Sequence, residues 1–135
     1  MDKTDQIDLA KYRLQKATVD LEAAQLNYAH GLMDAAANRS YYAIFHAARA
    51  VLALTGTDYK KHSGVIAFFR KEYVKTGVFE KKLSDIIQDA FEIRTDCDYE
   101  DFYVVAKEDV EQQIKNAKYF IEKIEAYLQA VFTNN

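Results

Sequence analysis

Proline is absent from the 135 residues of the chain, and glycine occurs only four times. Because proline interrupts helices and glycine weakens them, this scarcity predicts long helices joined by few loops. The single cysteine, Cys97, excludes an intramolecular disulfide and a cysteine-rich zinc site. The three histidines lie far apart in the sequence and show no metal-ligand spacing, so we expect no metal site.

Long apolar runs are also missing. No stretch approaches the roughly 20 residues that a membrane-spanning helix needs, and the polar, acidic start of the chain does not resemble a secretory signal. The net charge of −3 argues against a protein that coats nucleic acid through bulk charge, but it leaves room for a local basic site. We therefore expect a cytoplasmic protein that does not associate with membranes.

Apolar residues at helical spacing are what the sequence does contain. From about 5 to 30, and again from about 106 to 132, apolar residues recur at alternating steps of three and four. Residues at these steps share one face of a helix, so both segments are predicted to be long amphipathic helices. Two such helices could pack side by side in one bundle.

Three further helices are predicted between them. The first covers about 34 to 55 with Asp34 as its N-cap, and the second covers about 63 to 75 with Ser63 as its cap. The third covers about 79 to 95.

The acidic and aromatic segment from 95 to 105 breaks the helical period and is interpreted as a loop. The sequence shows no internal repeat, low-complexity tract or interdomain linker. The fold class predicted from these patterns is all-α, an antiparallel bundle of four to five helices that forms a single domain over 1–135.

The stretch NRSYYAIFHAARAVL, residues 38–52, has two distinct faces. Its core face is apolar and consists of Tyr41, Ile44, Phe45, Ala48, Val51 and Leu52. The opposite face holds Arg39, Tyr42, His46 and Arg49, with Arg39 and His46 about 10 Å apart along the axis. Such a stripe can hold an anion, stack on a base and move a proton.

Two other interpretations of this polar face remain open. A row of charged and aromatic residues is also what a solvated helix face looks like. The small residues Ala43, Ala47 and Ala50 would equally allow close approach of another helix, from the same chain or from a second copy.

The order of residues from Asn38 to Arg49 closely resembles the signature of the HEPN (higher eukaryotes and prokaryotes nucleotide-binding) domain family. The similarity is to its short stand-alone bacterial and archaeal members. A second motif, from Phe91 to Tyr99, matches in the same order, with an arginine followed by Asp-Tyr and then a long final helix. The resemblance implies a bundle of four or five helices that is commonly a homodimer.

The same resemblance implies a function. Many HEPN proteins are ribonucleases or toxins whose site, assembled across the dimer, is an arginine followed after four to six residues by a histidine. Arg39 and His46 satisfy this spacing, but the family motif usually begins later, in the region of Arg94. There Asp98 stands where the histidine is expected, and an ordinary aspartate, with a pKa near 4, is a poor acid at neutral pH.

These considerations give two sets of candidate site residues. The candidate catalytic residues are Arg39, His46, Arg94 and Asp98. The candidate nucleotide- or RNA-binding residues are Asn38, Tyr42, Arg49 and Tyr99. An alternative for Arg94 and Asp98 is an ion pair that pins the 96–105 loop, and the basic run 59–62 could be either an anion site or a solvated turn.

The hypothesis is a HEPN protein of a two-gene, toxin–antitoxin-like system. Resemblance to the family implies a minimal nucleotidyltransferase as partner and a dimeric Arg/His/Tyr site that acts on or binds RNA or a nucleotide. As an enzyme it would be a metal-independent endoribonuclease, and no cofactor is expected. The alternative hypothesis is a non-catalytic helical dimerisation module that binds a nucleotide or a protein.

Overall fold

The computed structural model describes residues 2–134, and these residues form helices and loops without any strand. The elements are α1 (Lys3–Ala29), α2 (Met33–Ala53), α3 (His62–Phe69), the π-helical turn η1 (Arg70–Val74), α4 (Lys81–Tyr99) and α5 (Lys107–Thr133). The predicted all-α bundle is therefore confirmed. None of the helices in the described range combines the length and the apolar character that crossing a membrane would require.

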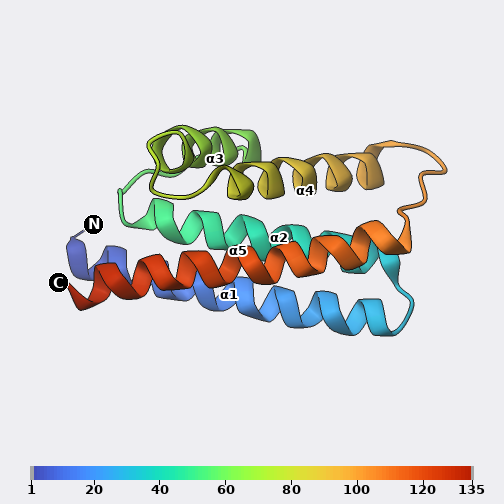
Figure 1. Ribbon diagram of the computed structural model, residues 1–135, viewed down its shortest axis with the longest axis horizontal. Helices are drawn as coiled ribbons and strands as arrows, with labels where there is room; N and C mark the ends of the chain where they lie inside the picture. Colours follow the sequence, from blue (N-terminus) through green and yellow to red (C-terminus); the bar gives the residue numbers. More distant parts are fainter. Residues whose placement is uncertain (1, 135) are drawn as a thin grey trace.

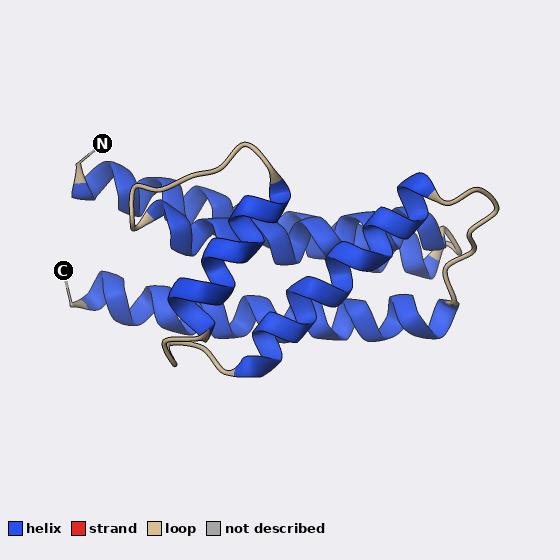
Figure 2. Ribbon diagram, turned by 90° about the horizontal axis from the view of Figure 1, so that it is seen from above, coloured by secondary structure: helices blue, strands red, loops and turns tan. Residues whose placement is uncertain are grey.

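The long helices lie along one axis of the molecule. α1, α2 and α5 pack side by side, and α3, η1 and α4 form a second layer over α2 and α5 (Figure 1). Seen from above, α3 and α4 lie at an angle to each other across the long helices (Figure 2). α1 and α2 run in opposite directions, as do α4 and α5, so both ends of the described chain lie at one end of the bundle (Figure 1).

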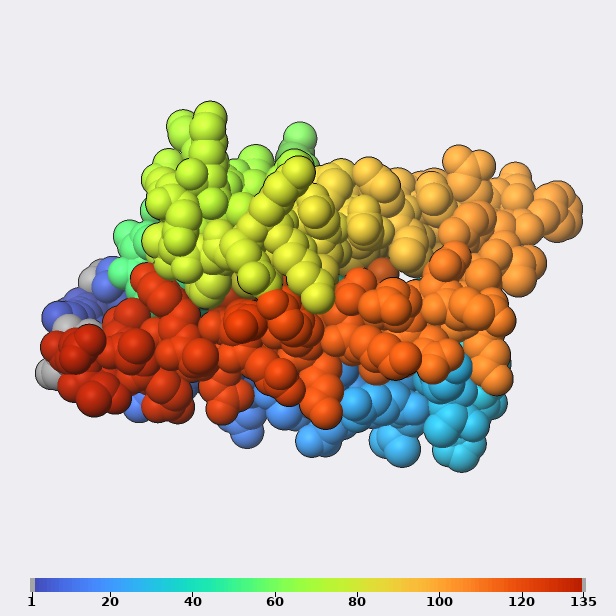
Figure 3. All heavy atoms as spheres, viewed as in Figure 1, coloured from blue at the N-terminus to red at the C-terminus, as the bar shows by residue number. Residues whose placement is uncertain are grey.

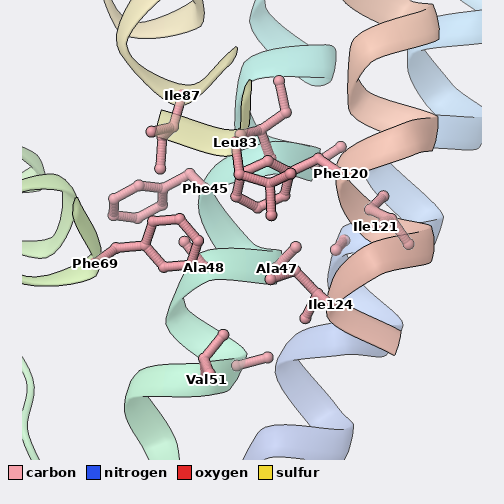
Figure 4. Packing of buried hydrophobic residues seen from close by; sticks show 14 of the residues in the cluster. Phe45, Ala47, Ala48, Val51, Phe69, Leu83, Ile87, Phe120, Ile121 and Ile124 are labelled. Atoms are coloured by element: carbon pink, nitrogen blue, oxygen red, sulfur yellow. The ribbon is translucent and has the colours of Figure 1, made fainter. Parts of the chain in front are cut away.

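The main core lies between α2 and the helices around it. Phe45 and Ala48 of α2 meet Phe69 of α3 and Ile87 of α4, and Phe120 of α5 closes the cluster from the other side (Figure 4). All of these side chains are buried. Burial of a large apolar side chain contributes about 1.5–3 kcal/mol, so this cluster holds the two layers together.

Small residues set how closely α1 and α2 approach. Ala43, Ala47 and Ala50 of α2 are fully buried, as are Ala10 and Ala17 of α1, and all five belong to one core cluster. Side chains this small let two helix backbones come close together. The neighbour that the alanines of α2 accommodate is therefore α1 of the same chain.

Three of the predicted helix boundaries need correction. Asp34 lies within the first turn of α2, where its charge suits the helix dipole, and Leu32 holds the N-cap position. Ser63 lies inside α3, whose N-cap is Lys61. The segment from 95 to 99 continues α4, so the loop is shorter than predicted.

The extension of α4 has a physical cause. Ile93 and Cys97, four residues apart, share one helix face and pack against a second apolar cluster that includes Val105 and Val110. The Thr95 hydroxyl donates to the carbonyl of Phe91, which occupies that polar side chain within the helix. Burial of this face keeps the acidic segment helical.

Candidate functional site

Side chains from three helices surround the ring of Tyr42. The guanidinium carbons of Arg39 and Arg94 lie 5.0 and 5.6 Å from the ring centroid. The rings of His46 and His62 lie 5.8 and 5.7 Å away, centroid to centroid. We call these five residues the Tyr42 cluster. It draws Arg39 and His46 from α2, Arg94 from α4 and His62 from α3.

Arg39 and His46 are linked through a carboxylate of α1. Arg39 Nη1 donates to Asp20 Oδ1 at 3.0 Å, and His46 Nε2 lies 3.8 Å from Asp20 Oδ2. The neighbouring Asn38 Oδ1 accepts from Arg39 Nη2 at 2.7 Å. The His46 and Asp20 side chains are each only 13% exposed, so this part of the polar stripe is not a solvated face.

The environment of His46 keeps its ring neutral at pH 7. Burial lowers the pKa of His46 to about 4, helped by the cationic groups of Lys16, Arg49 and Arg39. The nearby Asp20 carboxylate favours the charged ring, but at 3.8 Å it does not outweigh burial and the surrounding cations. His46 Nδ1 is buried and has no hydrogen-bond partner among the described residues.

His62, which was not among the candidate site residues predicted from the sequence, contacts Arg94. Its Nδ1 lies 2.8 Å from the Tyr41 hydroxyl and 3.4 Å from Arg94 Nη1. Its ring stacks on Phe45 with the centroids 4.1 Å apart. The only sequence signal for this residue was its place at the end of a basic run before a helix.

Arg94 and Asp98 form the ion pair considered as an alternative. Arg94 Nε lies 3.3 Å from Asp98 Oδ2, a contact without the alignment of a hydrogen bond. Both residues belong to α4, four positions apart, so the pair lies within one helix and does not pin a loop. It fixes the Arg94 head group beside Tyr41 and Tyr42.

Arg49 belongs to a neighbouring charged group. Arg49 Nη2 and Arg13 Nη2 both donate to Asp58 Oδ2, at 2.8 and 2.9 Å. Arg13 Nη1 also donates to the backbone carbonyl of Arg49 at 3.0 Å. Arg13 and Asp58, which the sequence did not single out, thereby tie α1 to the loop that follows α2.

A groove lies beside His62. It has a volume of about 420 Å³ and is lined by Phe45, Arg49, Asp58, Tyr59, Lys60 and His62. Two of its lining residues are permanent cations and one is a carboxylate. The groove is large enough for a phosphate group or part of a nucleotide.

Of the predicted site residues, Tyr99 stands apart. It is 78% exposed at the end of α4, and no contact found among the described residues joins it to the Tyr42 cluster. Asn38 contacts Arg39, and Asp98 contacts Arg94. Arg49 lies outside the cluster and pairs with Asp58. Within residues 2–134, no three His, Cys, Asp or Glu side chains group so as to hold a metal ion.

The surroundings of Tyr41 and His62 define their protonation. Burial raises the pKa of Tyr41, so its hydroxyl keeps its proton. Burial, with the positive charges of Arg94 and Arg49, lowers the pKa of His62. The Tyr42 cluster together with Arg49 and Tyr41 thus offers three arginines, two neutral imidazoles and two tyrosines. Such a set of groups can bind phosphate, stack on a base and exchange hydrogen bonds with a ribose.

Several known proteins are similar to this chain over most of its length. A UPF0332 protein of Thermotoga maritima is 34% identical over 121 residues, which cover 90% of this chain and 92% of the relative. A Methanocaldococcus jannaschii protein named "Putative toxin MJ0142" is 33% identical over 115 residues, covering 85% of this chain and 78% of the relative. A second protein of that organism, "Putative toxin MJ0605", is 32% identical over 118 residues, or 87% of each chain.

The region of the chain that matches a known family includes the helices that build the site. The model of the HEPN domain matches residues 10–127, a range that begins within α1, ends within α5 and contains the whole Tyr42 cluster. The match spans both motifs on which the resemblance rested. The chain therefore belongs to the HEPN domain family.

Proposed function

We propose that this HEPN protein acts on RNA at the Tyr42 cluster, as a homodimer and as the toxin-like member of a pair completed by a minimal nucleotidyltransferase. The observation that carries the proposal is the approach of Arg39 and Arg94, from two different helices, to the ring of Tyr42. Two histidines flank the same ring.

The chemistry of these groups suits an RNA backbone. A guanidinium offers several N–H donors in one plane and binds phosphate oxygens through paired hydrogen bonds. A half-buried tyrosine gives a base a face to stack on, worth about 1–3 kcal/mol per base. Arginines placed where a phosphate becomes more negative would also stabilise the transition state of strand cleavage.

Two further lines of support concern biological role and assembly. Two of the relatives bear the name of a toxin, which supports growth inhibition as the effect of the protein. The homodimer and the nucleotidyltransferase partner follow from resemblance to the family, whose site is assembled across a dimer.

The proposal is tested by expressing the protein without any partner. We expect growth arrest, RNA cleavage by the purified protein, and a loss of at least about 100-fold in cleavage rate for Arg94→Ala. Lys118→Ala, at an exposed position of α5, is the control and should cleave like the wild type. Normal growth together with intact RNA would refute the cleavage activity.

A non-catalytic binding module is the second candidate, and a specific observation favours it. Asp98 follows Arg94 where the family motif has a histidine, and His46 has a pKa of about 4, too low for a proton donor at neutral pH. Calorimetry with nucleotides and short RNAs separates the candidates. Binding that depends on Arg94 but yields no cleaved product would favour the binding module.

A further inference from the structure

We propose that His62 is the phosphate-contacting histidine of the site, and that the groove beside it receives a phosphate of the RNA backbone. The inference rests on the proposed function, because it takes RNA to be the ligand. It assigns to His62 a role that the family motif would give to a histidine following Arg94. It also extends the site from the Tyr42 cluster towards Arg49 and Lys60.

The contacts of Nδ1 fix which nitrogen of His62 carries the proton. Arg94 Nη1, 3.4 Å away, can only donate, so Nδ1 is the acceptor in that contact, and the Tyr41 hydroxyl, 2.8 Å away, then donates to the same nitrogen. Nδ1 therefore accepts, and the neutral ring carries its hydrogen on Nε2. This leaves His62 with an N–H donor on the side of the ring away from Tyr41 and Arg94.

The groove that His62 lines is suited to an anion. Arg49 and Lys60 supply positive charge. Asp58 lines the groove as well and opposes an anion, but its carboxylate already accepts hydrogen bonds from two guanidinium groups, those of Arg49 and Arg13. The local charge at this end of the groove remains positive.

The start of α3 adds to this environment. His62 is the first residue of α3, and no side-chain hydrogen bond caps the helix among the described residues. The first N–H groups of a helix point outward and carry partial positive charge. The N–H groups of Gly64 and Val65 already donate to the Lys61 carbonyl, so those of His62 and Ser63 are the ones that add to the positive potential at this end of α3.

His46 lacks the same access. Its side chain is 13% exposed, its Nε2 faces Asp20, and its Nδ1 is buried without a partner. An approaching phosphate would meet the Asp20 carboxylate first. Of the two histidines in the Tyr42 cluster, His62 is the one that lines a groove.

A matched pair of substitutions tests the role of Nε2. In His62→Asn the side-chain amide reaches only the position of Nδ1, so the Tyr41 contact is retained and the Nε2 donor is lost. In His62→Gln the amide reaches the position of Nε2 and can still donate. The probe is a short 2′-O-methyl RNA, which binds but cannot be cut through its own 2′-oxygen, and its dissociation constant is measured by fluorescence anisotropy.

We expect His62→Asn to weaken binding about 10-fold and His62→Gln to weaken it by about 2-fold or less, as fits loss and retention of one hydrogen bond to a charged group. His30→Asn, at the exposed end of α1, should bind like the wild type. Wild-type affinity in His62→Asn would overturn the role of His62 and leave the proposed function standing. No binding by the wild-type protein would overturn both.

A spectroscopic readout covers the case in which His62→Asn does not fold. In the ¹⁵N spectrum of the wild-type protein, the free His62 ring should show the Nε2–H tautomer. Its Nε2 signal should shift when the probe RNA is added, while the His46 signals move less. A free ring protonated at Nδ1, or a His62 signal unchanged at saturating RNA, would contradict the proposal.

Discussion

His46 shows how a single residue of the site makes stability depend on pH. Its ring is held neutral in the fold, with a pKa of about 4, whereas an unfolded chain would titrate it near the ordinary value of 6.5. Between these values the unfolded state binds more protons than the folded state. The contribution of His46 to folding is therefore complete above pH 6.5 and is lost as the pH falls towards 4.

The corresponding prediction is a pH-dependent difference between the wild type and His46→Gln. The wild-type free energy of unfolding should lose up to about 3 kcal/mol from this residue between pH 6.5 and 4. The variant should lose less over that range, because glutamine does not titrate. Urea unfolding at pH 7, 5.5 and 4 measures the effect, with the exposed His30→Gln as control. Parallel curves for His46→Gln and the wild type would contradict it.

The sequence predicted part of this site at residue level. Arg39, Tyr42 and His46 were found because three- and four-residue steps place side chains on one helix face, and that geometry is local. His62 was predicted only as part of the basic run 59–62, an anion site or a solvated turn, because its contacts to Tyr41 and Arg94 span 21 and 32 residues. No pattern within a single helix reports such a contact.

At the scale of elements, a shared carboxylate connects α1 to the loop after α2. The Arg13 side chain is only 9% exposed, and Asp58 Oδ2 is its side-chain partner. The same oxygen accepts from Arg49. One carboxylate thus positions both a buried cation and a residue of the groove.

Asp58→Asn should therefore destabilise the fold by about 1–2 kcal/mol, since a neutral amide compensates the buried Arg13 charge less well. The substitution should also weaken the hydrogen bond that holds the Arg49 side chain in place. Asp85→Asn makes the same chemical change at an exposed position of α4 and should have little effect. Urea denaturation at pH 7 compares the two variants, and equal stabilities would show that the Asp58 pair contributes nothing.

Helix boundaries could be predicted where an apolar stripe ran unbroken. The first and last helices were expected over about 5–30 and 106–132, and they cover Lys3–Ala29 and Lys107–Thr133. The end of α4 could not be predicted, because its last turn is acidic on the outside. What keeps it helical is packing of Cys97 against residues beyond the loop, a tertiary contact.

At the scale of the whole molecule, the segment after α4 protrudes at one end (Figure 3). It carries exposed apolar side chains next to the acidic residues Glu100 and Asp101. Phe102 is fully exposed with a φ of 61°, Val104 is 83% exposed, and Tyr99, the last residue of α4, is 78% exposed beside them in the chain. Apolar side chains grouped in this way typically mark a surface that contacts another protein.

If the proposed homodimer uses this segment, Phe102→Asp should shift it towards monomer. The substitution removes no intramolecular packing, so the free energy of unfolding of the monomer should hardly change. Sedimentation velocity compares it with Leu26→Asp, which changes an exposed apolar residue of α1. A dimer that is equally stable in both variants would place the interface elsewhere.

The ion pairs of the site have a consequence for selectivity. Each arginine already holds a carboxylate of its own chain; the pairs are Arg39–Asp20, Arg49–Asp58 and Arg94–Asp98. Under the proposed function, an incoming phosphate would have to compete with these carboxylates for the guanidinium groups. A lone phosphate ion would displace one carboxylate for little gain. If the proposed function holds, an RNA strand with several phosphates at matching spacing would displace these carboxylates together, so the protein should bind RNA more tightly than free nucleotides or salts.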